Sequence, residues 1–479
     1  MNTTVVSIVV IYLLAMHGIA YWVSRRIESN EDFMVAGRRL GPFMLAGTLA
    51  ATEVGGGSSL GVTEKAYGSW GMSAIWYVLA MGITFVLLSF IAPKLRQSMV
   101  KTVPEYFRKR YGPANGGVTA LIMIFPMIGL TAIQLMASAT ILSVMTGFSY
   151  SWSAVIVTVL VTEYSVLGGL WSVTVTDAVQ WVLVVVGTAL VIPYALDAAG
   201  GWETVVATVP ASKLSLTEGM GWPTIIAITL MYFTSFAVGQ EAVQRYYAAK
   251  DERAARLGSI IAAVFYALYA FIPAVLGIIA YSMVQTGALD PTLIEANGAR
   301  YVLPTMASQV LPPILVGGLF AALISATMSS ADSDLLAAGS IFSNDIYRIY
   351  INPNATDAQV LKVTRWTMVA VGFLSLLVAL MNWKDMVTVL MFSFALRAGG
   401  EFIPYVIGHY WKKATPAASL SSIVAGCATV IYVQNYKLPY LDFTGVDAIA
   451  GVCVNAIVFF TVSTLAPADE KKSSFGLNY

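Results

Sequence analysis

Apolar segments of about 20 residues recur along the whole chain, and they limit what it can fold into. Each is long enough to cross roughly 30 Å of hydrocarbon as an α-helix. The composition agrees, because 58% of the 479 residues are hydrophobic and only 11% are charged, too few to cover the surface of a soluble protein. We therefore expect an all-α polytopic membrane protein.

The sequence predicts thirteen transmembrane helices. They lie at about 3–24, 42–66, 72–93, 115–145, 151–170, 172–196, 222–247, 256–284, 314–344, 362–381, 384–410, 415–434 and 446–465. The first has neither the basic start nor the cleavage site of a signal peptide, so we expect it to be retained. No connection is long enough for a soluble domain, so residues 1–479 are expected to form a single membrane domain.

Lysine and arginine are distributed unevenly between alternate connections, which predicts the orientation. With the N-terminus outside and the C-terminus in the cytoplasm, the outer connections hold only Lys213, Arg300, Lys384 and Lys437. The cytoplasmic side then holds Arg25, Arg26, Arg38, Arg39, Lys94, Arg96, Lys101, Arg108, Lys109, Arg110, Lys250, Arg253, Arg256, Arg348, Lys362, Arg365, Lys412, Lys413, Lys471 and Lys472. We expect a multi-pass protein of the inner (plasma) membrane.

Two of the predicted helices are interrupted. Glycines Gly55, Gly56 and Gly57 follow Glu53 in the second segment, and Gly239 precedes Gln240 and Glu241 in the seventh. Backbone that leaves the helix at membrane depth is tolerated where it lines a cavity, and transporters with inverted repeats bind their solutes at such breaks. Close helix packing is the alternative for the glycines, but packing does not require the carboxylate of Glu53.

The ninth segment carries an unusual density of polar residues between Ser325 and Asp334. Ser329 and Ser333 are four residues apart and share one helix face, with Ser330 beside them. Sodium is a hard cation that prefers oxygen ligands, so these hydroxyls are candidate ligands, although such serines often bond only to their own helical turn. Asp332 and Asp334 favour a functional role, because charges at membrane depth are costly.

Three other charged positions have structural alternatives. Asp177 could cap its own helix, Glu241 could pair with Arg245 one turn on, and Arg397 could pair with Glu401. If Arg397 faces a cavity instead, it is the best candidate for holding a solute carboxylate.

Several function classes are disfavoured. The net charge of +1 does not suggest nucleic acid, and the two cysteines and two histidines, Cys427, Cys453, His17 and His409, do not suggest a disulfide or a zinc site. No nucleophile, metal cluster or phosphate loop is evident, so we do not expect an enzyme.

Several short motifs together resemble the sodium/solute symporters, a family that includes proline, galactose, sialic acid, pantothenate and choline transporters. The motifs are Ser29-Asn30-Glu31-Asp32-Phe33 with Ala36-Gly37-Arg38, Thr102-Val103-Pro104-Glu105-Tyr106-Phe107, Tyr164-Ser165-Val166-Leu167-Gly168-Gly169-Leu170, Gln244-Arg245 and Asp345-Ile346-Tyr347. The resemblance implies a LeuT-type fold, with a leading helix and loop (1–41), two inverted five-helix repeats (42–196 and 222–410), and two trailing helices with a short tail (411–479).

The resemblance also implies sodium sites. Its core sodium site maps to the carbonyls of Ala51, Val54 and Ala326 and the hydroxyls of Ser329 and Ser330. A second cation site, as in the sialic acid symporter, maps to Asp177, Ser329, Ser330, Asp332 and Ser333, with Asp332 replacing a serine. Glu53 aligns with an acid important for sodium in the proline symporter. The number of sodium ions per cycle stays open, because Asp332 could either strengthen a second cation site or bind a proton in its place.

The solute is less well defined by the resemblance. Ser58, Trp76 and Tyr77 replace the sugar-contacting residues of the galactose symporter, which argues against a hexose. The run from Val54 to Gly57 is similar to the choline transporter, but Glu53 replaces an aromatic residue of its cage. The residues expected to contact the solute are Glu53, Gly55, Gly56, Gly57, Ser58, Trp76, Tyr77, Gln240 and Arg397.

We therefore expect a sodium-coupled importer of a small organic solute that works by alternating access. An amino acid or small carboxylate is the favoured solute class, and a choline-like or other organic amine is the alternative. A membrane sensor and a channel are rival functions. The expected partners are the solute, sodium and the lipid bilayer, without nucleic acid, and we treat the chain as a monomer.

Overall fold

The computed structural model describes residues 3–25, 29–381, 386–436 and 443–465, which are almost entirely helical. The helices of the first half are α1 (Thr3–Ser24), α2 (Asn30–Val35), α3 (Pro42–Glu53), α4 (Val62–Tyr67), α5 (Ile75–Gln97), α6 (Val103–Tyr111), α7 (Pro113–Thr146), α8 (Tyr150–Ala198), α9 (Trp202–Thr208) and α10 (Ala211–Leu214). Those of the second half are α11 (Gly221–Phe236), α12 (Gln240–Ala248), α13 (Glu252–Tyr269), α14 (Phe271–Thr286), α15 (Thr292–Asn297), α16 (Val302–Val310), α17 (Pro313–Ile341), α18 (Asp357–Leu380), α19 (Met386–Gly408), α20 (Pro416–Tyr436) and α21 (Val446–Leu465). Short 3-10 or π-helical turns are η1 (Ala36–Arg38), η2 (Gly57–Gly61), η3 (Gly71–Ala74), η4 (Ala299–Tyr301) and η5 (Phe342–Ile351).

The described residues contain ten helical stretches long and apolar enough to cross a membrane, or eleven if α11 and α12 count as one bent span. The predicted number of thirteen is therefore not confirmed. One difference is α8, whose 49 residues include the non-helical Gly169 (φ 54°, ψ −174°), where the sequence predicted two separate segments. The other is α3, whose 12 residues span only about 18 Å.

Helix ends follow local sequence signals. The Thr102 hydroxyl accepts a hydrogen bond from the Glu105 backbone N–H at 3.1 Å and so caps α6. Thr356 and Gln359 form a capping box at the start of α18. Gly147 ends α7 in the left-handed conformation, with φ at 74°.

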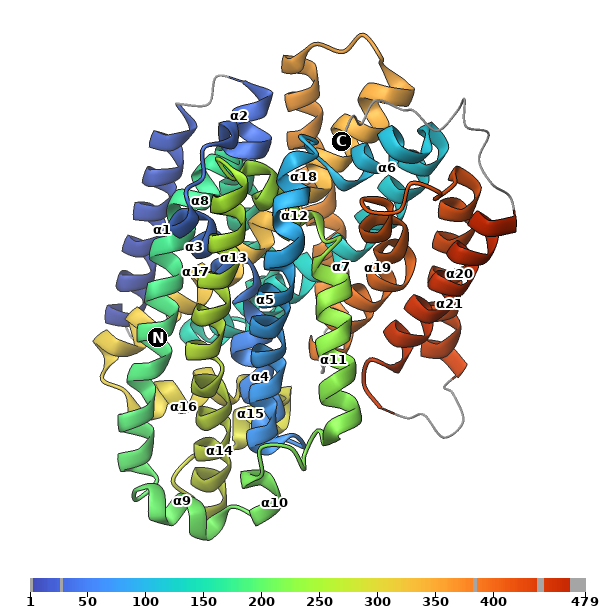
Figure 1. Cartoon of the computed structure of the whole chain (residues 1–479). Coiled ribbons are helices and arrows are strands. Elements are labelled where there is room, and N and C mark those ends of the chain that lie inside the picture. The colour runs from blue at the N-terminus through green and yellow to red at the C-terminus, as the bar shows by residue number, and fades with distance from the viewer. Residues whose placement is uncertain (1–2, 26–28, 382–385, 437–442, 466–479) are drawn as a thin grey trace.

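The helices form a central bundle with flanking helices on either side (Figure 1). In that view α1 lies at one edge and α20 and α21 lie at the opposite edge. Helix α17 is central. An 18-residue apolar stretch of the span Pro313–Ile351 is 83% buried, compared with 22% for the corresponding stretch of α1. The polar segment of α17 therefore lies inside the protein and away from lipid.

The broken helix of the first half lies beside that of the second half. The Leu40 N–H, just before α3, donates to the Ala248 carbonyl at 3.1 Å, and the Lys250 N–H donates to the Leu40 carbonyl at 2.9 Å. Helix α13, which follows, is tied to α3 by the Tyr266 hydroxyl, which donates to the Leu49 carbonyl at 2.8 Å. These contacts hold α3 alongside α12 and α13.

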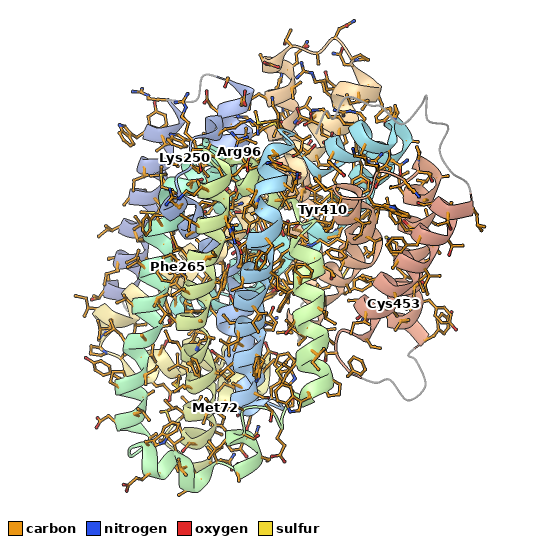
Figure 2. All side chains as sticks on the ribbon, in the orientation of Figure 1. Met72, Arg96, Lys250, Phe265, Tyr410 and Cys453 are labelled. Atoms are coloured by element: carbon orange, nitrogen blue, oxygen red, sulfur yellow. The ribbon has the colours of Figure 1, made fainter. Side chains whose placement is uncertain are left out.

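Basic residues gather at one end of the bundle. Arg96 and Lys250 lie near the end that carries α2 and α6, whereas Met72 lies toward the end that carries α9 and α10 (Figure 2). The Arg96 guanidinium donates to the Ala249 carbonyl at 2.5 Å, and the Arg38 guanidinium donates to the Tyr247 carbonyl at 3.0 Å. Five basic residues used in the orientation prediction lie outside the described residues, namely Arg26, Lys384, Lys437, Lys471 and Lys472.

Candidate functional site

The first predicted break is present at the end of α3. Val54 leaves the helical conformation (φ −85°, ψ 72°), and the chain resumes as the π-helical turn η2. Gly55 must be small, because a Cβ there would lie 2.4 Å from Gln134 Oε1 and 2.5 Å from Ser330 Oγ. Gln134 on α7 accepts a hydrogen bond from the Gly56 N–H at 2.7 Å. The glycines thus allow α3 to approach both α7 and α17.

The second predicted break is present between α11 and α12, which are bent by 53°. Gly239 occupies the bend with φ −62° and ψ 115°. A Cβ at this position would lie 2.7 Å from a Glu241 carboxylate oxygen and 2.9 Å from the Arg397 guanidinium. The bend therefore makes room for a buried ion pair.

Four of the five residues mapped as the core sodium site come together between α3 and α17. The hydroxyls of Ser329 and Ser330 lie 3.3 Å and 3.5 Å from the Ala51 carbonyl oxygen. Ser330 also lies 3.2 Å from the Ala326 carbonyl oxygen. The fifth residue, Val54, is buried at the break itself. Carbonyl and hydroxyl oxygens are the ligands that a hard monovalent cation prefers.

Beside these oxygens lies a buried network around Asp177, on the second half of α8. Its carboxylate accepts hydrogen bonds at 2.5 Å from the hydroxyls of Ser329 and Thr48. The Arg245 guanidinium lies 3.5 Å from Asp177 and donates to the Ser333 hydroxyl at 2.6 Å. Arg245 therefore lies between Asp177 and Ser333, two of the residues predicted to hold a second cation.

Asp332 lies close enough to Asp177 and Arg245 to interact with them electrostatically, but among the described residues it makes no hydrogen bond to this network. Its carboxylate interacts with the Ser165 hydroxyl on the first half of α8, and its Oδ1 atom has no hydrogen-bond partner within the described part of the chain. The structure thus brings Asp177, Ser329 and Ser333 together but leaves Asp332 to one side of them.

A narrow cavity lies next to the first break, with a water-accessible free volume of about 20 Å³ inside about 360 Å³ of space that no atom fills. Its lining combines three carboxylates with apolar and aromatic side chains. The lining residues are Thr52, Glu53, Gly57, Ser58, Tyr77, Met81, Leu130, Gln134, Glu241, Asp334, Leu390 and Phe394.

Four residues expected to contact the solute line this cavity: Glu53, Gly57, Ser58 and Tyr77. Gly55 and Gly56 lie behind the lining, against Gln134 of α7. Gln134 and Asp334 are lining residues that sequence reasoning did not assign. The only sequence signal for Gln134 is a lone amide within an apolar helix.

Trp76 and Gln240 lie elsewhere. The Trp76 indole N–H donates to the Leu216 carbonyl at 2.8 Å. The Gln240 side chain accepts from the Val103 N–H at 2.8 Å and donates to the Lys101 carbonyl at 3.1 Å. Their polar groups bond to loops next to α10 and α6, and neither residue is among the described lining residues of this cavity.

The buried ion pairs also differ from those predicted. Arg397 lies 2.6 Å from Glu241, so the partner of Glu241 is on α19 and not at Arg245, one turn along α12. Arg245 instead donates to the backbone carbonyl of Glu241. The predicted Arg397–Glu401 ion pair is not formed, and the Glu401 oxygens have no hydrogen-bond partner among the described residues. Arg397 is thus already paired behind the cavity wall.

The fold matches that of solved transporters. A Na⁺-coupled sialic acid symporter in a substrate-bound outward-open state superposes with a TM-score of 0.84 and 21% identity, covering 98% of this chain and 99% of that one. A nucleobase-cation-symport-1 family transporter gives 0.57 and 15% identity over 94% of this chain and 98% of the other.

The sequence comparisons agree over nearly the whole length. The osmoregulated proline transporter of Bacillus subtilis is 24% identical over 98% of this chain and 96% of its own. The sodium/pantothenate symporter of Haemophilus influenzae is 27% identical over 92% and 93%. The model of the sodium:solute symporter family matches residues 33–426. These matches agree with the breaks and the oxygen cluster already described, and the chain belongs to the sodium:solute symporter family.

Proposed function

We propose that this sodium-coupled symporter binds its coupling ion where the break of α3 meets α17. The observation that carries the proposal is the position of the Ser329 and Ser330 hydroxyls, which face the Ala51 carbonyl across that break. Val54 and Ala326 would supply two further carbonyls. A cation here would bridge the interrupted helix α3 and the continuous helix α17, so its binding would favour one relative position of these two helices.

Gly57 and Ser58, which line the cavity, come shortly after the proposed sodium ligands Ala51 and Val54 along the chain. Sodium therefore holds the first break in the shape that completes the solute site, and solute binding favours sodium in return, since coupling between two sites is reciprocal. The membrane potential supplies about 2.3 kcal/mol per charge per 100 mV. That energy corresponds to roughly 50-fold accumulation for each sodium ion.

The inverted-repeat architecture is part of the proposal. Three changes would raise the count from ten to thirteen: counting the bent pair α11 and α12 as one span, dividing α8 at Gly169, and counting α3 with η2 and α4 as one broken span. The thirteen helices would be arranged as a leading helix, repeats at 42–196 and 222–410, and two trailing helices. We propose the plasma membrane as the location, with the N-terminus outside and the C-terminus inside, and a monomeric carrier. The basic residues near α2 and α6 support this orientation.

We propose one sodium per cycle at the core site. Asp177 already has a positive partner in Arg245, whose guanidinium also bonds to Ser333. A sodium ion at the second position would have to displace that guanidinium, which would remain buried and unpaired.

Replacing Ser329 with alanine is expected to raise the sodium concentration for half-maximal transport by about tenfold or more, because one hydroxyl ligand is lost. The measurement is sodium-dependent, solute-induced current in proteoliposomes. Ser340→Ala is the matched control, since Ser340 lies on the same helix and its buried hydroxyl has no hydrogen-bond partner in the described segments. Equal sodium dependence in the two variants would remove Ser329 from the sodium site.

Counterflow of labelled solute distinguishes a carrier from a channel and from a sensor. Labelled solute should enter sealed vesicles against its own gradient when they are preloaded with unlabelled solute and equal sodium is present on both sides. A channel gives only equilibration under these conditions, and a sensor gives no flux.

A further inference from the structure

We propose that the solute is a small organic cation that carries N–H donors, an amine or a guanidine. The inference rests on the proposed transport function and assigns the class of solute that the cavity beside α3 accepts. It follows from the charge of the cavity wall, the pairing of the nearby arginines and the aromatic side chains of the same wall.

The cavity wall is acidic. Glu53, Glu241 and Asp334 line it, and no lysine or arginine is among its described lining residues. Arg397 lies behind the wall and pairs with Glu241 at 2.6 Å. One guanidinium pairs with one carboxylate, so Glu53 and Asp334 remain as two acids on the cavity wall without an ion-pair partner among the described residues.

These two carboxylates lack protein partners. Asp334 is 4% exposed and lines the cavity, yet it makes no hydrogen bond or ion pair within the described ranges. Glu53 Oε1 is buried without a hydrogen-bond partner there. The two acids are close enough to interact electrostatically with Glu241 and, more weakly, with the guanidinium groups of Arg397 and Arg245. A buried acid without an ion-pair partner either takes up a proton or is held ionised by a cationic ligand, and the cavity is the space from which such a ligand could reach both.

The remaining buried cation nearby cannot serve this purpose. Arg245 is held by the Thr48 hydroxyl at 2.9 Å, the Ser333 hydroxyl at 2.6 Å and the Asp177 carboxylate at 3.5 Å. Sodium at the core site brings a single positive charge, which leaves at least one carboxylate uncompensated. A solute carboxylate would add a further negative charge to this wall, and a sugar would leave its charge unbalanced. An organic cation balances it.

The rest of the wall suits the carbon skeleton of such a cation. Met81, Leu130 and Leu390 are apolar, and Tyr77 and Phe394 add aromatic rings, a type of side chain that attracts cations. The Arg397 guanidinium already lies over the Phe394 ring, 4.8 Å from its centroid. The ring of Tyr232 packs edge-on against Tyr77 and Phe394, at centroid distances of 5.6 Å and 5.5 Å. Carboxylates bind charged N–H donors more strongly than they bind a methylated nitrogen without donors. This preference selects amines and guanidines over quaternary ammonium compounds.

The test uses purified protein in proteoliposomes, with solute-induced currents recorded in sodium and in potassium. Uptake of labelled lactate is measured as well, because one sodium ion with one lactate anion carries no net charge. The probes are putrescine, agmatine, choline, proline, lactate and glucose. We expect sodium-dependent currents with putrescine or agmatine, and none with proline, lactate or glucose. In Asp334→Asn, the amine concentration for half-maximal current should rise at least ~30-fold, the effect typical of losing one partner of a buried charge pair.

Two controls separate solute binding from folding and from sodium coupling. Glu163→Gln removes an exposed carboxylate of α8 that is outside the cavity, and it should retain wild-type amine affinity. Thermal stabilisation of Asp334→Asn by sodium should stay within about threefold of the wild-type sodium dependence, which shows that the variant is folded. Glu53→Gln is a second variant that removes a carboxylate from the same cavity wall.

Each outcome decides one of the two proposals. Sodium-dependent currents with proline or glucose alone, or sodium-dependent uptake of lactate alone, would overturn the cation inference and leave symport intact. Currents with amines that do not require sodium would retain the inference and contradict sodium coupling. A response to choline alone, unchanged amine affinity in both Asp334→Asn and Glu53→Gln, or no response to any amine would each overturn the assignment.

Discussion

Replacing Arg397 with leucine is expected to destabilise the folded protein by about 3–5 kcal/mol, the usual cost of removing one partner of a buried ion pair. Arg397 is fully buried, lies 2.6 Å from Glu241 and donates to the Ser235 hydroxyl at 2.5 Å. Leucine would leave the carboxylates of Glu241 and Glu401 buried without a positive charge. The melting temperature in detergent measures the effect.

The double variant Arg397→Leu/Glu241→Gln is the informative control. Removing both charges should recover a large part of the lost stability, because glutamine carries no charge that needs a partner. Equal melting temperatures for the single and double variants would show that the Arg397–Glu241 pair does not account for the loss.

Replacing Arg245 with alanine should have an effect of similar size, but one that depends on sodium. Arg245 provides the positive charge beside Asp177 and bonds to Ser333 and Thr48. Without it, Asp177 is a buried unpaired carboxylate, so we expect a loss of about 3–5 kcal/mol in potassium buffer. The vacated position is surrounded by oxygens, so sodium should bind there and restore part of the stability.

The measurement is the melting temperature of the wild type and of Arg245→Ala in sodium and in potassium at equal ionic strength. The increase caused by sodium should be larger in the variant. Arg245→Lys keeps a charge and should respond to sodium as the wild type does. A variant equally unstable in both salts would contradict the view that this guanidinium takes the place of a second cation.

The positions of the helix breaks could be predicted from the sequence, because glycines free the backbone of an apolar helix and an acid beside them is costly in contact with lipid. The position of Ser329 and Ser333 on one face of α17 followed from helical periodicity, but the approach of Ser329 and Ser330 to Ala51 was implied only by family resemblance. Asp334, two residues from Asp332, was left unassigned, and the structure places it in the cavity wall.

Pairings between distant helices could not be predicted. Sequence spacing shows neighbours one turn apart, which led us to pair Glu241 with Arg245 and Arg397 with Glu401. The bend at Gly239 instead directs Glu241 toward α19, where Arg397 meets it at 2.6 Å. Trp76 was likewise assigned from its position in the family, although its indole bonds to the Leu216 carbonyl. In each case a contact between separate helices or loops decides the role of the residue.

The most direct test of the account is equilibrium binding of labelled sodium to the purified protein without solute. The wild type should bind one sodium ion saturably, and the double variant Ser329→Ala/Ser330→Ala should lose this binding while Ser340→Ala retains it. Unchanged sodium binding in the double variant would contradict a coupling ion held between the break of α3 and α17.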